Sequence, residues 1–280
     1  MKVEETKVKA RTPEQALAII RSVVDVVPDA GIVLGSGITA LQDLVEPHSF
    51  SFHQVFGVEP TVAGHAGTIT IGKLPENEAV TLVVFRGRYH VYEGHDWDVV
   101  TLPTRTLIEW GVKELILTNA SGGINPLFKV GDLMVMTGFR DLISEKWRGG
   151  IIEALQTFPK ECRNELSEKI FVNGARLAQI DKEFWPLKNG IYAGFTGPSY
   201  ETLAEVEMVR RMGCDNVAMS TVPELLTAAG SPMKAAAVSV ITNVWNEDTV
   251  ITGHEEVLEA SKGASKRLDK LLRYMLSGRR

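Results

Sequence analysis

Apolar residues along this chain follow two patterns, short runs that suit buried strands and longer stretches with helical spacing. The short runs are rich in Val, Ile and Leu, as is typical of strands. They predict strands at residues 31–35, 67–74, 79–87, 114–119, 132–139, 190–195, 216–219 and 234–242. The longer stretches predict helices at residues 12–27, 36–45, 97–111, 161–178, 201–213, 223–230 and 255–276.

The order of these elements indicates the fold class. Because strands alternate with helices, we expect an α/β fold: a single domain over residues 1–280, with a central mixed, mainly parallel sheet flanked by helices. Residues 67–74 and 79–87 are separated by the polar "PENE" and alternate with a period of two, which predicts an antiparallel hairpin. Residues 140–160 mix helix breakers with apolar residues, as in a mobile loop, and carry no firm prediction.

Two local signals refine the picture near the start of the chain. Thr12 is followed by Pro13 and Gln15, the pattern of a capping box with proline at the first helical position. Gly35 and Gly37 lie between a predicted strand and a predicted helix. A glycine turn that leads into a helix start is a ready anion site, although such turns between strand and helix are also common where no phosphate binds.

Composition narrows the class of protein. The 280 residues are 44% hydrophobic and 23% charged, as in an ordinary globular protein. The net charge is −5 and basic residues are scattered, which argues against a nucleic-acid surface. Cys162 and Cys214 form neither a disulfide framework nor a metal spacing, so we expect a reducing, cytoplasmic location. The charged first 15 residues lack the apolar core of a secretory signal, and no run is long enough for a membrane span.

Short polar clusters follow several of the predicted strands. They are Gly35–Gly37, Arg86–His90, Thr118–Gly123, Met219–Thr221 and the pair Thr242 and Asn243. If the sheet brings these ends together, an arginine pair, a histidine, hydroxyls and backbone amides would share one site. This set suits phosphate or another small oxyanion and requires no metal.

Several of these clusters also have another interpretation. "GSGITA" fits the GxGxxA form of the dinucleotide fingerprint, which makes a nucleotide-binding module an alternative hypothesis. That hypothesis needs an acidic residue closing a second strand about 20 residues on. Glu59 is near that distance, but its surroundings have little strand character. Taken alone, His90 would more often be a structural histidine, and Met219 a core residue.

The motifs together resemble one known family. "GIVLGSGI", "GHAGTITIG", "FRGRYHVYEGH", "TNASGGIN", "GPSYETLAEV", "MSTVPE" and "ITN" followed by "HEEVL" are similar, in order and spacing, to the trimeric purine nucleoside phosphorylases. The resemblance implies phosphorolysis of a purine nucleoside to the free base and ribose 1-phosphate, as in purine salvage. It also implies a homotrimer that uses phosphate as co-substrate and needs no cofactor.

The resemblance implies roles for particular residues. His90, Glu201 and Asn243 would be catalytic. The phosphate site would consist of Ser36, His65, Arg88, His90, the backbone amide of Ala120, and Ser220. The nucleoside site would consist of Tyr92, Met219 and His254 at the sugar and Tyr200, Glu201, Thr242 and Asn243 at the base.

Asn243 carries the predicted substrate preference. Its amide can hydrogen-bond N7 and the 6-oxo group of hypoxanthine or guanine, and Thr242 would support it. The related methylthioadenosine phosphorylases usually have aspartate there, which favours a 6-amino purine. We therefore expect inosine and guanosine as substrates, with methylthioadenosine phosphorylase as the alternative.

Two segments depart from the family pattern. "FRDLISEKWRGG" replaces a longer segment that usually carries "HIN" and an aromatic residue for the neighbouring subunit's sugar site; Trp147 and Phe158 are candidates for that role. The segment between Asn243 and His254 is shorter than usual. These departures leave open a changed sugar preference or a catalytically weak nucleoside-binding relative.

Overall fold

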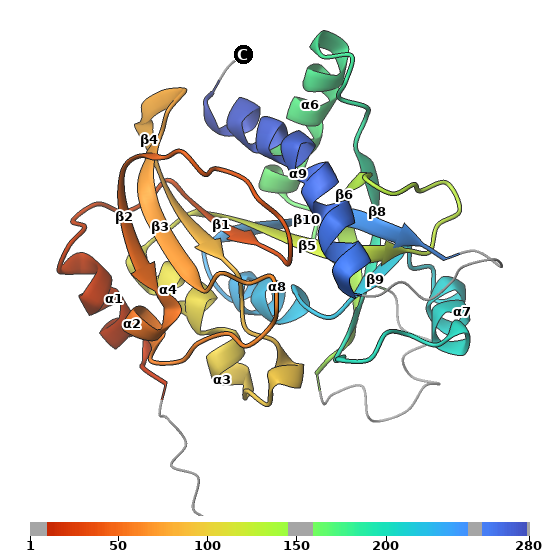
Figure 1. The fold of residues 1–280 in the computed structure, drawn as a ribbon, viewed down its shortest axis with the longest axis horizontal. Coiled ribbons are helices and arrows are strands. Elements are labelled where there is room, and N and C mark those ends of the chain that lie inside the picture. Colours follow the sequence, from red (N-terminus) through yellow and green to blue (C-terminus); the bar gives the residue numbers. More distant parts are fainter. Residues whose placement is uncertain (1–9, 145–158, 246–253, 279–280) are drawn as a thin grey trace, which may run out of the picture.

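The computed structural model describes residues 10–144, 159–245 and 254–278, and a ten-stranded sheet runs through them (Figure 1). Its strands are β1 (Ala30–Leu34), β2 (Val45–Ser51), β3 (Thr68–Leu74), β4 (Asn77–Arg86), β5 (Glu114–Gly123), β6 (Leu133–Leu142), β7 (Lys160–Glu161), β8 (Lys188–Phe195), β9 (Asn216–Ala218) and β10 (Lys234–Val244). The helices are α1 (Pro13–Arg21), α2 (Phe52–Phe56), α3 (Trp97–Val100), α4 (Leu102–Trp110), α6 (Glu165–Ile180), α7 (Leu203–Arg211), α8 (Val222–Ala229) and α9 (His254–Leu276), with a 3-10 turn η1 (Val91–Glu93).

The strand pairings close part of the sheet into a ring. β5 pairs with β10, β10 with β6, β6 with β8, β8 with β9, and β9 again with β5. β1, β4, β3 and β2 extend from β5 as an open wing. The central strands β4, β1, β5 and β10 are parallel neighbours, as are β6, β8 and β9 on the far side of the ring. Antiparallel pairs lie in the wing and where β10 meets β6 and β5 meets β9. The predicted α/β fold with a mixed sheet flanked by helices is confirmed.

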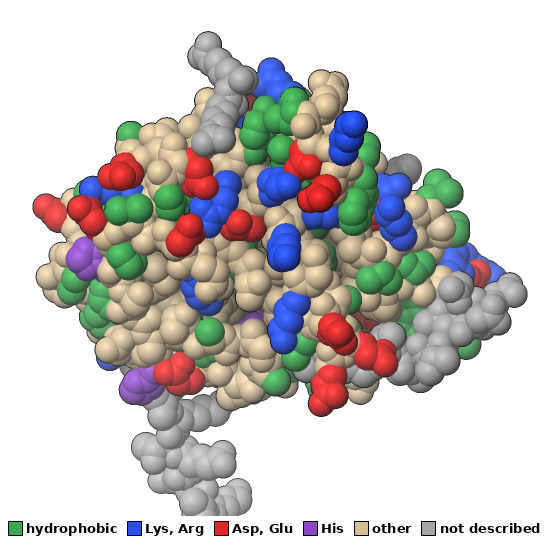
Figure 2. All heavy atoms as spheres, turned by 45° about the horizontal axis from the view of Figure 1, so that its top comes forward, with side chains coloured by type: hydrophobic (Ala, Val, Ile, Leu, Met, Phe, Trp, Pro, Cys, Tyr) green, Lys and Arg blue, Asp and Glu red, His purple; other side chains and the backbone are tan. Residues whose placement is uncertain are grey.

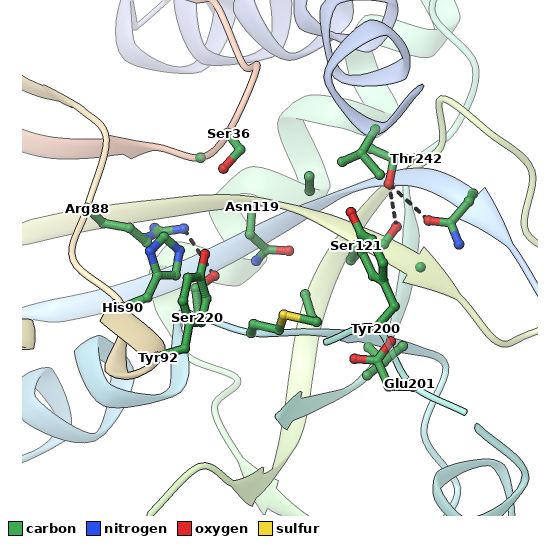
Figure 3. A pocket seen from close by; sticks show the side chains of 18 of the residues that line it. Ser36, Arg88, His90, Tyr92, Asn119, Ser121, Tyr200, Glu201, Ser220 and Thr242 are labelled. Atoms are coloured by element: carbon green, nitrogen blue, oxygen red, sulfur yellow. Dashed lines mark hydrogen bonds between the residues drawn. The ribbon is translucent and has the colours of Figure 1, made fainter. Parts of the chain in front are cut away.

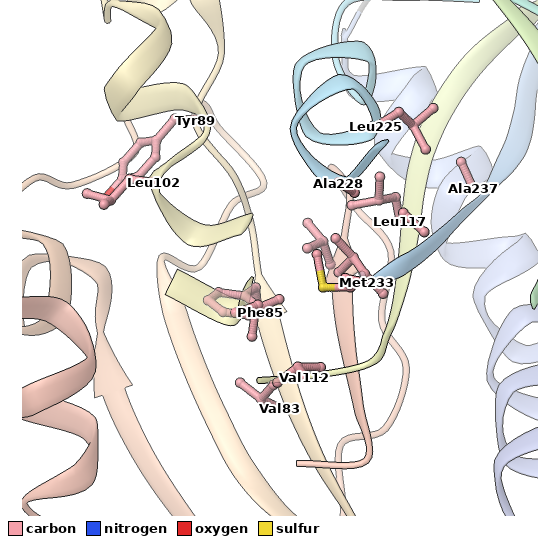
Figure 4. Packing of buried hydrophobic residues seen from close by; sticks show 14 of the residues in the cluster. Val83, Phe85, Tyr89, Leu102, Val112, Leu117, Leu225, Ala228, Met233 and Ala237 are labelled. Atoms are coloured by element: carbon pink, nitrogen blue, oxygen red, sulfur yellow. The ribbon is translucent and has the colours of Figure 1, made fainter. Parts of the chain in front are cut away.

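Apolar side chains of the central strands are buried on both faces. Val33 and Val83 pack against α1, α4 and α8, in the cluster of Figure 4. Their neighbours Ile32 and Val84 pack on the opposite face, against α6 and α9. A strand covered by helices on both sides needs apolar residues at every position, which explains the unbroken runs in the sequence.

Several local predictions are confirmed. Thr12 and Gln15 form the capping box, with Gln15 N–H donating to Thr12 Oγ1 at 3.3 Å. α1 ends at Arg21, earlier than its apolar pattern predicted. The predicted hairpin is the antiparallel pair β3 and β4. The helix predicted at 97–111 is divided into α3 and α4 at Thr101, and it ends at Gly111, whose φ is +88°.

The helix predicted at residues 36–45 is wrong. The segment contains turns, and its backbone groups bond to distant side chains: Thr39 N–H donates to Ser265 Oγ (2.9 Å) and Leu41 N–H to Asp269 Oδ1 (2.7 Å). Arg86 donates to the carbonyl oxygen of Leu41 (2.7 Å). These bonds replace the helical ladder. Since no helix begins after Gly35, the nucleotide-binding hypothesis loses the helix start on which it depended.

Two strands also differ from the prediction. β5 does not end in a glycine turn but continues through "ASGG" to Gly123, because residues 118–123 pair with β10. β2 was not predicted, since its polar sequence and exposed positions lack an alternating apolar pattern. It is an edge strand that pairs only with β3 among the described residues.

The surface has a mixed charge distribution. Acidic and basic side chains lie interspersed over the face shown in Figure 2, in keeping with the net charge of −5 and the scattered basic residues. Within the described ranges, every helix is too short or too polar to cross a membrane.

Candidate active site

A cleft of about 840 Å³ lies at the carboxyl ends of the central strands (Figure 3). The cleft is lined by twelve of the thirteen predicted site residues: Ser36, His65, Arg88, His90, Tyr92, Ala120, Tyr200, Glu201, Met219, Ser220, Thr242 and Asn243. The thirteenth, His254, begins α9, but its side chain is outside the described residues, as are Trp147 and Phe158.

Strand direction explains why these residues meet. β4, β1, β5 and β10 run in parallel, so the segments that follow or end them lie at one edge of the sheet. β9 is antiparallel to β5, but its register pairs Val217 with Gly122 and brings the following Met219 and Ser220 beside the same edge. Asn119 Nδ2 donates to Thr221 Oγ1 (3.0 Å) across this junction.

Arg88 provides the positive charge of the cleft. Its side chain is buried, with Nε donating to Glu224 Oε1 (3.1 Å) and Nη1 to the Thr118 carbonyl (2.7 Å) and Ser220 Oγ (3.3 Å). Nη2 is buried and has no hydrogen-bond partner among the described residues. A fixed guanidinium with an unused N–H pair suits an anionic ligand.

Arg86 is not part of this site, so of the two arginines in "RGRYH" only Arg88, the one that the resemblance implied, lines the cleft. Its Nη1 and Nη2 donate to the carbonyl oxygens of Ala40 (2.9 Å) and Leu41 (2.7 Å), outside the cleft. Arg86 therefore holds the segment that was predicted to be helical.

Two histidines stack beside Arg88. His65 Nε2 lies 3.0 Å from Ser36 Oγ, and the His65 ring stacks on His90 with centroids 5.1 Å apart. Burial, followed by the nearby His90 and Arg88, lowers the pKa of His65 to about 3, so this ring is neutral. Gly87 has a φ of +128°, and a Cβ there would lie 2.8 Å from that of His65. Glycine therefore permits this close approach.

Glu93 is a functional candidate that the sequence prediction missed. Its Oε1 accepts from the His90 backbone N–H (2.7 Å) and lies 3.0 Å from His90 Nδ1, and its Oε2 accepts from Thr61 N–H (2.6 Å) and Oγ1 (2.7 Å). Burial opposes the ionised carboxylate, but hydrogen bonds from His90 and Thr61 lower the pKa of Glu93 to about 2. The carboxylate holds the Nδ1–H form of His90 and leaves Nε2 for a ligand. The sequence offered one signal for this pair, because His90 and Glu93 lie three residues apart in "HVYE".

Replacing Glu93 with glutamine should lower kcat/KM for phosphate by about 10- to 100-fold, because a hydrogen bond to an ionised partner is lost. Steady-state kinetics with phosphate as the varied substrate measure this. Thr61→Val removes one bond to Oε2 but keeps the carboxylate on His90, so its effect should be smaller. Equal kinetics for Glu93→Gln and the unmutated protein would contradict the positioning role.

The opposite end of the cleft contains a hydrogen-bond acceptor, the Glu201 carboxylate, and the side-chain amide of Asn243. Glu201 is 8% exposed, and burial raises the pKa of its carboxyl group to about 7. Thr242 Oγ1 lies 3.2 Å from both Asn243 Oδ1 and the Ser121 carbonyl oxygen, so its single O–H is shared between these two acceptors (Figure 3). This leaves the Asn243 NH₂ group as a donor. Tyr200 is 40% exposed beside Glu201.

Four buried polar atoms around the cleft have no partner among the described residues. They are Arg88 Nη2, Asn119 Oδ1, Glu201 Oε1 and Trp245 Nε1. Buried polar groups in native proteins are nearly always hydrogen-bonded, so this concentration indicates a ligand. Asn119 and Ser121 belong to the predicted polar cluster Thr118–Gly123 but were given no role of their own, and Trp245 was not predicted, because it follows β10 without a local motif. Within the described ranges, no group of three His, Cys, Asp or Glu residues could hold a metal.

Comparison with known proteins places the chain in a family. The sequence model of the phosphorylase superfamily matches residues 29–277. Purine nucleoside phosphorylase 1 of Bacillus subtilis is 36% identical over 277 residues, covering 94% of this chain and 97% of the relative. The chain belongs to the purine nucleoside phosphorylase family. The purine nucleoside phosphorylase of Bos taurus is 33% identical over 268 residues, 89% of each chain.

Solved structures of purine nucleoside phosphorylases have the same fold. The Schistosoma purine nucleoside phosphorylase in complex with hypoxanthine has a TM-score of 0.78 and 28% identity, covering 95% of this chain and 96% of that one. The Schistosoma mansoni purine nucleoside phosphorylase in complex with inosine has a TM-score of 0.78 and 26% identity, covering 96% of both chains. The predicted family membership is therefore confirmed.

Proposed function

We propose that this protein is a purine nucleoside phosphorylase that cleaves 6-oxopurine nucleosides with inorganic phosphate. The products are the free base and ribose 1-phosphate. The observation that carries the proposal is the placement of unpaired Arg88 Nη2 and unpaired Glu201 Oε1 in one cleft. Arg88 Nη2 can bind an anion, and Glu201 Oε1 can accept a hydrogen bond from a purine base.

Phosphate binds at the Arg88 end. Arg88 Nη2, Ser220 Oγ, Ser36 Oγ and the Ala120 amide provide the donors, while the unprotonated His90 Nε2 accepts from a phosphate O–H. The two histidines have lowered pKa values, His90 chiefly through burial, so the fixed charge opposite phosphate comes from Arg88. Phosphate is both nucleophile and counter-ion for the sugar cation that forms as the glycosidic bond breaks. Its attack from the face opposite the base inverts the anomeric carbon.

The base lies between Glu201 and Asn243. The N1–H of a 6-oxopurine donates to the Glu201 carboxylate. Asn243 donates to N7 or O6, where negative charge gathers as the base departs, and such a donor lowers the barrier. Tyr92, whose ring stacks on His90 with centroids 4.7 Å apart, lies beside the sugar, and Met219 packs beneath it.

Asn243 supports the choice of a 6-oxopurine. The Schistosoma structures include complexes with guanosine and with adenosine, so those relatives alone do not decide the preference. Asn243→Asp should lower the inosine-to-adenosine ratio of kcat/KM by about 10-fold or more, because a carboxylate accepts from a 6-amino group and repels a 6-oxo group. A substrate panel measures the ratio, and an unchanged ratio would exclude Asn243 as the selector. Ser239→Ala, deeper on the same strand, is the matched control.

The direct test is the release of hypoxanthine from inosine, followed by ultraviolet absorbance with and without phosphate. Phosphate-dependent cleavage supports the proposal. Cleavage of methylthioadenosine instead would establish the alternative activity, and no cleavage by the folded protein would leave a binding protein. We further propose a cytoplasmic homotrimer that needs no cofactor; sedimentation and activity after chelation test the last two points.

A further inference from the structure

Trp245 lines the cleft and has no expected role in binding or catalysis. It directly follows β10, and its backbone N–H donates to the Gly123 carbonyl (2.8 Å), which fixes it to the end of β5. Its side chain is 7% exposed and packs in the cluster that contains Val206 and Val217. The indole is therefore held rigidly at the wall of the cleft, close to the predicted base site.

The indole nitrogen has no hydrogen-bond partner among the described residues. Nε1 is buried, and it cannot act as an acceptor, because an indole N–H can only donate a hydrogen bond. A Cβ on Gly122 would lie 3.1 Å from Trp245 Nε1 and 3.2 Å from Asn243 Nδ2. Both nitrogens therefore lie beside Gly122, where even a Cβ would be crowded, and both residues line the cleft.

A ligand acceptor is the natural partner for this donor. Leaving a buried N–H unpaired is unfavourable, so such a group at the wall of a ligand cleft is best explained by a bond formed in the complex. The Thr242 hydroxyl bonds to Asn243 Oδ1 and turns the Asn243 NH₂ group toward the ligand. Two donors then lie near each other on the wall of the cleft, beside Gly122.

We propose that Trp245 Nε1–H donates to the 6-oxygen of the purine, beside the bond from Asn243. This inference rests on the proposed function and adds a specificity-determining residue to it. A carbonyl oxygen has two lone pairs and can accept both bonds, whereas a 6-amino group would set a donor against the indole N–H. Because negative charge develops on the departing base, the bond strengthens in the transition state and acts on kcat as well as on binding.

The test compares Trp245→Phe with the unmutated protein on inosine and on purine riboside, which has hydrogen at C6. We expect kcat/KM for inosine to fall about 10-fold, the value of one hydrogen bond, and kcat/KM for purine riboside to stay within about 2-fold. An unchanged inosine-to-purine-riboside ratio overturns the proposal. Absence of inosine cleavage by the unmutated protein would instead mean that the proposed function has failed.

Trp110→Phe is the matched control. Trp110 is also buried, at 2% exposure, but its Nε1 donates to the Val26 carbonyl (3.0 Å) away from the cleft. Losing that bond should lower stability and leave the substrate ratio unchanged. A change in the ratio of the same size as for Trp245→Phe would show a general effect of indole loss and overturn the proposal.

A second measurement uses the unmutated protein, so it does not depend on the folding of a variant. The chain has five tryptophans, whose indole N–H resonances can be followed after nitrogen-15 labelling. Hypoxanthine should shift one indole resonance downfield, and purine, which lacks the 6-oxygen, should not produce that shift. The same response to both bases, or none to hypoxanthine, contradicts the bond.

Discussion

Replacing Arg88 with lysine should lower kcat/KM for phosphate by about 100-fold or more while the protein stays folded. The guanidinium is held by Glu224, Thr118 and Ser220 so that Nη2 remains free for an anion. A lysine keeps one positive charge opposite Glu224 but loses the planar fork, and each charge-assisted bond contributes about 1.5–3 kcal/mol. Initial rates with varied phosphate measure the effect.

Lysine is preferable to an apolar replacement for this test. The Arg88 and Glu224 side chains are 3% and 7% exposed, so removing the cation would leave a buried carboxylate unpaired. That change would destabilise the fold by about 3–5 kcal/mol and obscure the effect on catalysis.

Arg86→Lys is the control for Arg88→Lys. Arg86 lies two residues earlier, is also partly buried, and bonds to Ala40 and Leu41 outside the cleft. It should lower the melting temperature without changing KM for phosphate. If Arg88→Lys keeps the phosphate kinetics of the unmutated protein, Arg88 is not the phosphate ligand.

Replacing Glu201 with glutamine should lower kcat/KM for inosine by about 100-fold. The purine N1–H then meets a neutral amide instead of a carboxylate, and a hydrogen bond to an ionised group is worth about 1.5–3 kcal/mol. Glu207→Gln is the control, because Glu207 lies on α7 outside the cleft and pairs with Arg210 and Arg211. Near-normal activity of Glu201→Gln on inosine would remove Glu201 from the site.

Because of the Glu201 carboxyl group, we also expect the binding of the base to depend on pH. Burial raises the pKa of Glu201 to about 7, so protonation below that pH removes the acceptor for N1–H. Hypoxanthine affinity, measured without phosphate so that phosphate titration plays no part, should fall as pH drops through 7. Glu201→Gln should lack this inflection, and a shared inflection would assign it to another group.

Stability of the unliganded protein should change in the opposite direction. A carboxyl group with a pKa of about 7 in the folded protein and an ordinary pKa of 4.5 in the unfolded chain favours folding at low pH. That contribution is present below about pH 4.5 and is lost as pH rises through 7, by on the order of 3 kcal/mol. Glu201→Gln should therefore unfold at a higher temperature than the unmutated protein at pH 8, which thermal melts can check.

The sequence by itself determined the elements whose signals are local. Buried strands showed as continuous apolar runs, because helices cover both faces of the central sheet. The capping box at Thr12 and the β3–β4 hairpin depend on residues a few positions apart, and both formed as predicted. Twelve predicted site residues also line one cleft, since motifs that follow parallel strands meet at one edge.

The tertiary structure alone decided features that depend on distant partners. Residues 36–45 have helical spacing, yet their amides bond to Ser265 and Asp269 on α9, more than 200 positions away. β5 continues to Gly123 because β10 pairs with it. Trp245 is a candidate because its Nε1, which has no partner among the described residues, lies near Asn243. Local propensity contributes less than a kcal/mol per residue, so long-range hydrogen bonds and packing override it wherever the two conflict.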